Sequence, residues 1–127
     1  MIISVRLQLS RKKGFNLQEH SRAINGLPAI ICARPSVFGN PFKIGDPHPE
    51  HDRPMSREDA VEAHRKALFG GLLCYRVKLE EYVRARKWQG SFDPATIKSF
   101  LRGHNLACWC GPQALCHAST LLEIVNS

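Results

Sequence analysis

The chain has 127 residues, of which 43% are apolar and 23% charged, the balance of an ordinary globular protein, which argues against wholesale disorder. No apolar run approaches the ~18 residues of a membrane span, and the start of the sequence lacks the layout of a signal peptide. We therefore expect a cytoplasmic protein with no membrane partner, folded as a single domain over residues 1–127. The formal charge of +7 favours polyanions as partners, nucleic acid above all.

The first half of the chain predicts two strands and a long loop. Apolar and polar residues alternate over residues 2–9, which predicts a half-buried strand. The short apolar run at residues 29–33 predicts a second strand, and residues 15–28 between them are expected to be irregular. Prolines recur from Arg34 to Pro54 and favour a loop, because each removes a backbone donor and restricts the preceding residue.

The second half predicts helices with one further strand. Ser56 is placed to cap a helix that ends at Gly70-Gly71, and Asp93-Pro94 begins another that ends at Gly103. The remaining elements are a helix carrying Tyr75, Leu79, Tyr82 and Val83 on one face, a strand over 106–110, and a last helix over about 117–125. The sequence thus predicts an α/β fold with a small sheet of a few strands packed by about four helices.

Three of the five cysteines lie between Cys108 and Cys116. An odd count without a secretory signal favours thiol chemistry or metal binding over a disulfide framework. The other two, Cys32 and Cys74, have apolar neighbours in the sequence and are expected to be small core residues.

The cysteine cluster could form a metal site. Residues two apart on a strand face the same way, so Cys108 and Cys110 should present both thiols to one side, with Trp109 packed on the other. The turn at Gly111-Pro112 would then bring Cys116 to the start of the last helix. With His117, the three thiolates could supply the four ligands of a tetrahedral zinc ion. Because adjacent side chains diverge, a three-cysteine site without His117 is an equal alternative.

A catalytic thiol is the other functional interpretation of the cluster. Cys116 at a helix start beside His117 resembles an activated nucleophile with a lowered pKa, and His117 could carry the proton. A metal-bound water is a second candidate for the reactive group. A third interpretation, ranked below these, is that the cysteines only pack.

The segment from Arg34 to Phe42 follows a predicted strand and is a candidate ligand loop. We expect Arg34, Ser36 and Asn40 to bind the ligand, because ligands gather where strands end in α/β sheets. The two phenylalanines of this loop, Phe38 and Phe42, are expected in the core. The loop should share one pocket with the cysteine cluster.

Four motifs resemble a family catalogued as domain of unknown function 4326. They are Ser-Arg-Lys-Lys-Gly-Phe (10–15), Arg-Pro-Ser…Gly-Asn-Pro-Phe (34–42), Ser-Arg-Glu-Asp-Ala-Val (56–61) and Leu-Ala-Cys-Trp-Cys…Cys-His (106–117). The resemblance implies a short stand-alone protein of phage or bacterial genomes, a setting associated with nucleotides, nucleic acid or host defence. It implies no particular activity.

Two functional hypotheses follow. The leading one is a phage-type domain that binds a nucleotide or nucleic acid at the Arg34/Asn40 loop beside the cysteine centre, with turnover left open. The alternative is an interaction module that binds a host or phage protein and uses its cysteines structurally. If Arg76, Arg84 and Lys87 form one basic patch with residues 11–13, nucleic-acid binding should depend strongly on salt.

Overall fold

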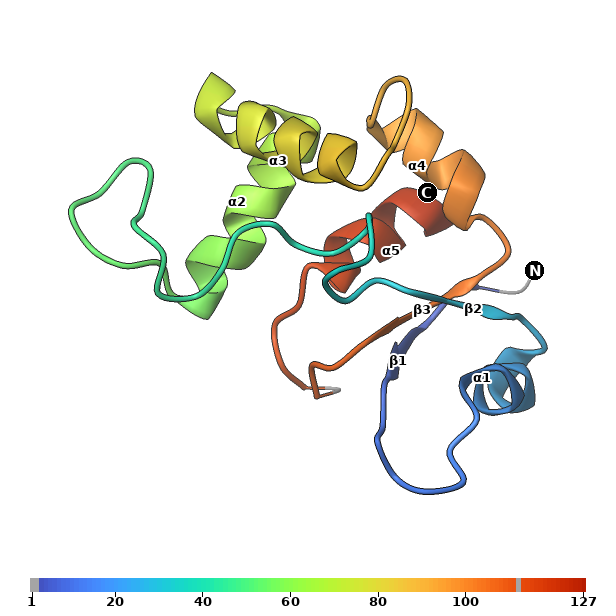
Figure 1. Ribbon diagram of the computed structural model, residues 1–127. Coiled ribbons are helices and arrows are strands. Elements are labelled where there is room, and N and C mark those ends of the chain that lie inside the picture. Colours follow the sequence, from blue (N-terminus) through green and yellow to red (C-terminus); the bar gives the residue numbers. More distant parts are fainter. Residues whose placement is uncertain (1–2, 112) are drawn as a thin grey trace.

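The computed structural model describes residues 3–111 and 113–127 of the chain. Within these residues a small sheet is surrounded by helices (Figure 1), which confirms the predicted α/β class with five helices rather than about four. The elements in chain order are β1 (Arg6–Gln8), α1 (Leu17–Asn25), β2 (Ala29–Ile31), α2 (Arg57–Phe69), α3 (Leu73–Ala85), α4 (Pro94–Leu101), β3 (Asn105–Cys108) and α5 (Ala118–Asn126).

The sheet has the order β1-β3-β2, and both pairings are parallel. Leu7 pairs with Ala107, and Ile30 pairs with Leu106. The first and last predicted strands are therefore neighbours in one sheet, as expected. Both strands are shorter than predicted, and residue 2 lies outside the described residues. Because the strands are parallel, their carboxyl ends share one edge, where the Arg34 loop and the cysteine loop both begin.

The two faces of the sheet carry separate cores. Leu106 of β3 belongs to the main core, which contains buried residues of α2, α3, α4 and α5. Its neighbour Ala107 points the other way, into a smaller cluster with Leu7 and Ala29, against which Leu17 of α1 packs. This alternation along one strand is why a four-residue strand can be buried throughout.

Helix α1 was not expected, and the prediction of irregular structure over 15–28 is wrong. The Asn16 side chain caps the helix by accepting from the Glu19 N–H, and Gly26 ends it in the left-handed region at φ 81°. Only Ser21 of the helix is fully buried. Its hydroxyl donates to the Leu27 carbonyl and accepts from Asn105 Nδ2. Asn16 and Gly26 are helix-end signals that the sequence carries and that the prediction of irregular structure did not use.

The two helix starts that were predicted from capping residues are confirmed by their caps. Ser56 and Asp59 form a reciprocal capping box on α2, and Asp93 accepts from the Thr96 N–H at the start of α4. Phe38 and Phe42 are buried as expected, and so is Cys32, whereas Cys74 is exposed and is not a core residue. No helix in the described part of the chain is long and apolar enough to cross a membrane.

Candidate metal and ligand site

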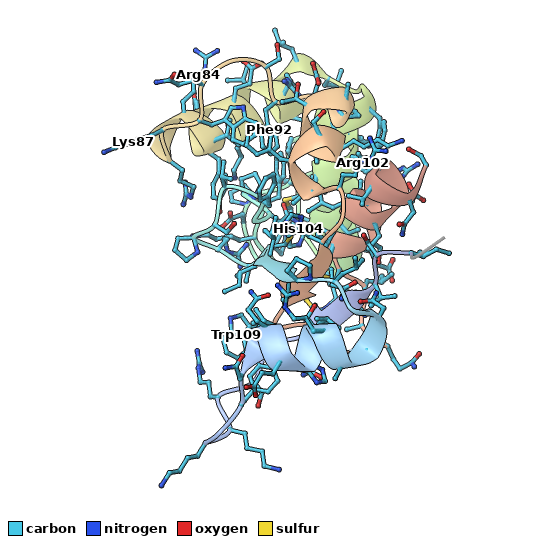
Figure 2. All side chains as sticks on the ribbon, turned by 90° about the vertical axis from the view of Figure 1, so that its right-hand side faces the viewer. Arg84, Lys87, Phe92, Arg102, His104 and Trp109 are labelled. Carbon is cyan, nitrogen blue, oxygen red and sulfur yellow. The ribbon has the colours of Figure 1, made fainter. Side chains whose placement is uncertain are left out.

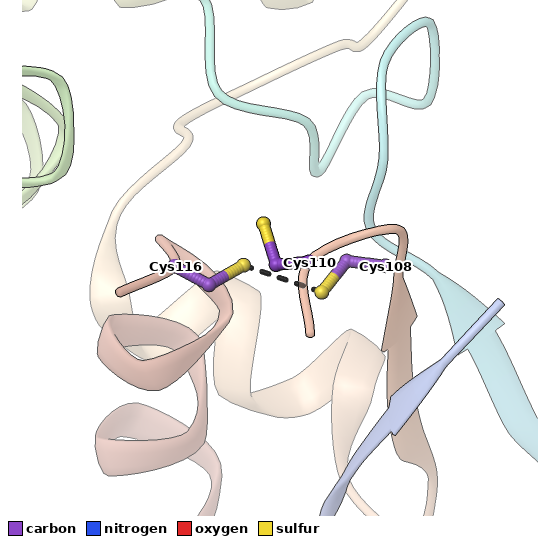
Figure 3. Close-up of side chains that lie close together, drawn as sticks. All are labelled: Cys108, Cys110 and Cys116. Atoms are coloured by element: carbon purple, nitrogen blue, oxygen red, sulfur yellow. Dashed lines mark hydrogen bonds between the residues drawn. The ribbon is translucent and has the colours of Figure 1, made fainter. Parts of the chain in front are cut away.

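The three clustered sulfurs converge on one point at the carboxyl end of β3. The Sγ atoms of Cys108, Cys110 and Cys116 all lie within 4.8 Å of one another (Figure 3). Cys108 and Cys116 are buried and their sulfurs are 3.2 Å apart, while Cys110 is half-buried. The strand ends at Cys108, so Cys110 reaches the cluster from the bend that follows rather than from the same strand face. Trp109 does not pack in the core but is 46% exposed.

Arg6 holds the loop that returns Cys116 to the cluster. Its guanidinium donates to the Ala114 carbonyl at 3.0 Å and to the Gly111 carbonyl at 2.9 Å. Arg6 lies on β1 beside β3, so the loop is attached to the neighbouring strand. Pro112, the other residue of the predicted turn, lies outside the described residues. Nothing in the sequence marks Arg6 for this role, because it occupies an ordinary polar position of an alternating strand.

His117 joins the cysteine loop to the Arg34 loop. Its Nε2 lies 2.7 Å from the Cys32 carbonyl oxygen and 3.1 Å from that of Phe38. Both partners are acceptors, so Nε2 must carry a proton and donate. Nδ1 lies 3.7 Å from the Cys116 sulfur. Among the described residues, the group whose atoms could together hold a metal consists of the three cysteines, without His117.

The thiol pKa values differ from the expected pattern. The pKa of Cys108 is lowered, chiefly by its hydrogen bond with the Cys116 sulfur. The pKa of Cys116 is raised by the same hydrogen bond and by burial. The prediction of a lowered pKa at Cys116 is therefore wrong. The helix start is there, but the hydrogen bond between the two sulfurs lowers the pKa of Cys108 and raises that of Cys116.

Two further thiols, one half-buried and one buried, have raised pKa values. Burial raises the pKa of Cys110, although the nearby Arg57 opposes it. Burial raises the pKa of Cys32 to about 12, so this thiol stays protonated. Cys32 lies outside the convergent group and packs in the main core.

The Arg34 loop is held by its own polar groups. Asn40 is buried, and its Nδ2 donates to the Ala60 carbonyl at 3.0 Å while its Oδ1 accepts from the Phe42 N–H at 2.9 Å. Arg34 is exposed and donates to the Asn40 carbonyl at 2.8 Å. Gly39 allows the close approach, since a Cβ there would lie 2.6 Å from the Tyr82 hydroxyl and 2.9 Å from the Arg34 nitrogen.

A pocket of about 220 Å³ brings the two predicted motifs together. Its lining includes Arg34 and Asn40 from the loop, the three clustered cysteines and His117, which confirms that both motifs share one pocket. Ser36 is not among its lining residues; its hydroxyl accepts from the Phe38 N–H at 3.2 Å.

Two pocket residues were not predicted as ligand contacts. Arg57, the first residue of α2, places Nη1 3.6 Å from the Cys110 sulfur and 3.3 Å from the Leu115 carbonyl oxygen. Trp109 lines the pocket as well, and the Arg11 guanidinium lies 4.7 Å from its ring centroid. Among the described residues that line this pocket there is no carboxylate. Arg57 could have been suspected as a cation at a helix start, where an acidic residue is more usual.

The basic residues outside the pocket do not form the single patch considered above. Arg84 and Lys87 lie at the opposite end of the molecule from Trp109, over whose ring Arg11 is placed (Figure 2). Arg76 and Arg84 are moreover paired with Glu80 at 3.0 and 4.0 Å.

These observations define a small α/β domain with a convergent three-thiol group and two guanidinium groups at the carboxyl edge of a parallel sheet. The chain matches the family described as Domain of unknown function (DUF4326) over residues 10–127 and belongs to it. No curated protein and no solved structure matches it.

Proposed function

We propose that this domain binds a phosphate-bearing nucleotide in the pocket between Arg34 and Arg57, beside a zinc ion held by Cys108, Cys110 and Cys116. The observation that carries the proposal is the lining of the pocket. Two arginines line it, and no carboxylate is among its described lining residues. A pocket with this lining attracts anions. Arginine presents a planar fork that suits a phosphate group.

Trp109 favours a nucleotide over a simple anion. An indole that lines the pocket and is 46% exposed offers a surface on which a base can stack. The contact with Arg11 supports the ring on the loop that follows β1. The phosphate would lie toward Arg34 and Arg57, and the base toward Trp109.

The sulfur geometry supports zinc more than a catalytic thiol. Tetrahedral Zn–S bonds of ~2.3 Å place neighbouring sulfurs ~3.8 Å apart, and the sulfurs here lie within 4.8 Å of one another, the nearest pair at 3.2 Å. Small rotations would bring all three into range. Cys116 as nucleophile is less favoured, because it is buried and its pKa is raised. Three sulfur ligands leave a fourth position for water or the bound ligand.

Ligand binding is tested by titrating the nucleoside monophosphates, unphosphorylated nucleosides and inorganic phosphate into the protein by calorimetry. Loss of a charge-assisted hydrogen bond costs ~1.5–3 kcal/mol, so Arg34→Ala should weaken nucleotide binding by ~10- to 150-fold. Arg34→Lys should recover part of it, because it keeps the charge without the fork. Arg102→Ala removes the same charge at an exposed position after α4 and should bind as the unchanged protein.

If the protein binds no nucleotide, or if Arg34→Ala binds nucleotide as tightly as the unchanged protein, this proposal is overturned and the protein-interaction alternative is favoured. The metal is tested separately by elemental analysis of protein purified without an affinity tag. One zinc per chain that is lost in Cys110→Ser, but kept in Cys74→Ser, supports the site. Cys74 is the suitable control because it is an exposed cysteine outside the cluster.

A further inference from the structure

A second, more open hollow adjoins the ligand pocket at Arg34. It measures about 610 Å³ and lies between the Arg34 loop and α3. Arg34 lines both hollows, so the two are joined at this side chain. Four cations line the second hollow, namely Arg34, Lys43, Lys78 and Arg86, with Glu81 as its one acidic group in the described part of the chain.

Most of these cations are not neutralised within the protein. Lys78 lies 3.7 Å from Asp46. In the described part of the chain, no carboxylate lies within ion-pair distance of Arg34, Lys43 or Arg86. The second hollow therefore extends the positive charge of the ligand pocket across the surface.

Arg86 is fixed in place rather than free in solvent. Its Nε donates to the Pro35 carbonyl at 2.7 Å, and its guanidinium lies 3.4 Å from the centroid of the Tyr82 ring. The Tyr82 hydroxyl in turn donates to the Ser36 carbonyl at 2.6 Å. Arg86, at the end of α3, is thus held against the loop that carries Arg34, which reduces the entropy lost when an anion binds to both.

We propose that the ligand is single-stranded nucleic acid, with one nucleotide in the Arg34/Trp109 pocket and the adjoining phosphates in the groove of Lys43, Lys78 and Arg86. Arg34, at the junction, contacts the phosphate that links the two parts. This inference rests on the proposed function and names its substrate class. Several cations lining a hollow that adjoins the ligand pocket suit a chain of phosphates, whereas a mononucleotide needs only the first pocket.

A single strand fits the pocket better than a duplex does. The pocket extends to buried sulfurs at the sheet edge, and Trp109 beside it offers one face for stacking. A base that is paired and stacked in a duplex would have to leave the helix to enter, which costs a few kcal/mol. Bases of a single strand are already accessible.

The test measures binding of a fluorescent single-stranded oligonucleotide, the same sequence as a duplex, and a mononucleotide. The variant is Lys43→Ala, since Lys43 is exposed and no ion pair in the described structure involves it. It should weaken the single strand and lower the salt slope by ~0.7, the value for one phosphate contact on a single strand. Mononucleotide affinity should not change. Arg102→Ala is the matched control and should leave both affinities and the slope unchanged.

The outcomes separate this inference from the proposed function. If the mononucleotide binds in an Arg34-dependent way but the oligonucleotide binds no tighter, or Lys43→Ala has no effect, the single-strand inference fails and the proposed function stands. A duplex that binds as tightly as the single strand also overturns the inference. If neither mononucleotide nor oligonucleotide binds, both proposals fail. If Lys43→Ala unfolds at the same temperature as the unchanged protein, misfolding is excluded as the cause of weaker binding.

Discussion

Asn40 tests how the ligand loop is held, because its side chain lines the pocket while its polar atoms bond to the protein. The residue is 7% exposed, and its amide joins the Ala60 carbonyl to the Phe42 N–H. Asn40→Ala would leave the buried Phe42 N–H without its partner, at ~1–3 kcal/mol, and would remove a second hydrogen bond from the Ala60 carbonyl of α2, at ~0.5–1.5 kcal/mol. We expect the free energy of unfolding to fall by ~2–4 kcal/mol. For 127 residues this lowers the Tm by ~7–15 °C.

Thermal and urea unfolding of Asn40→Ala measure this loss. Asn16→Ala is the matched control, because the same side chain is removed from an exposed position where it caps α1 through one hydrogen bond to the Glu19 N–H. A cap of this kind contributes ~1 kcal/mol. If Asn40→Ala is no less stable than Asn16→Ala yet has lost nucleotide binding, the amide of Asn40 serves the ligand and the structural argument is refuted.

Three other predictions concern metal, pH and stacking. If zinc binds the cluster, chelation should lower the Tm, because a ligand at 1,000 times its Kd stabilises by ~4.1 kcal/mol; an unchanged Tm in zinc-depleted protein would contradict a stabilising metal. His64 is buried and its pKa is held well below the ordinary value by burial and by His117. Only the unfolded chain therefore gains this proton, so between about pH 7 and 5 the free energy of unfolding should fall by up to ~2 kcal/mol. In urea titrations, the free energy of unfolding of His64→Leu should fall less over that pH range than that of the unchanged protein. An equal fall would assign the effect to other groups. Trp109→Ala should weaken nucleotide binding by ~1–3 kcal/mol with little change in Tm, since the side chain is 46% exposed. Trp88 is the tryptophan that remains in this variant. If nucleotide quenches tryptophan emission as strongly in Trp109→Ala as in the unchanged protein, the base binds elsewhere.

The local elements of the fold could be predicted from the sequence wherever a cap or an alternation marks them. Ser56 and Asp93 identify their helices because an N-cap bond joins residues only three apart. The convergence of Cys108 and Cys116 could be predicted as well, because a short loop between a strand end and a helix start leaves few ways to separate them. Helix α1 also carries local signals, the Asn16 cap and the Gly26 end, which the prediction overlooked. Its anchor on the sheet is the hydrogen bond from Asn105 to Ser21, which joins residues 84 apart in the sequence and leaves no local pattern.

The composition of the site was decided by the tertiary structure. The order β1-β3-β2 places the Arg34 loop and the cysteine loop at one edge of the sheet, and helix packing brings Arg57 there from α2. Asn40 turns its amide oxygen toward the Phe42 N–H because a buried loop must satisfy its own backbone groups. The lowered thiol pKa likewise belongs to Cys108 rather than to Cys116 at the helix start, because of the 3.2 Å contact between the two sulfurs. Sequence spacing determined which residues could meet, and long-range packing determined which atoms of those residues remain available to a ligand.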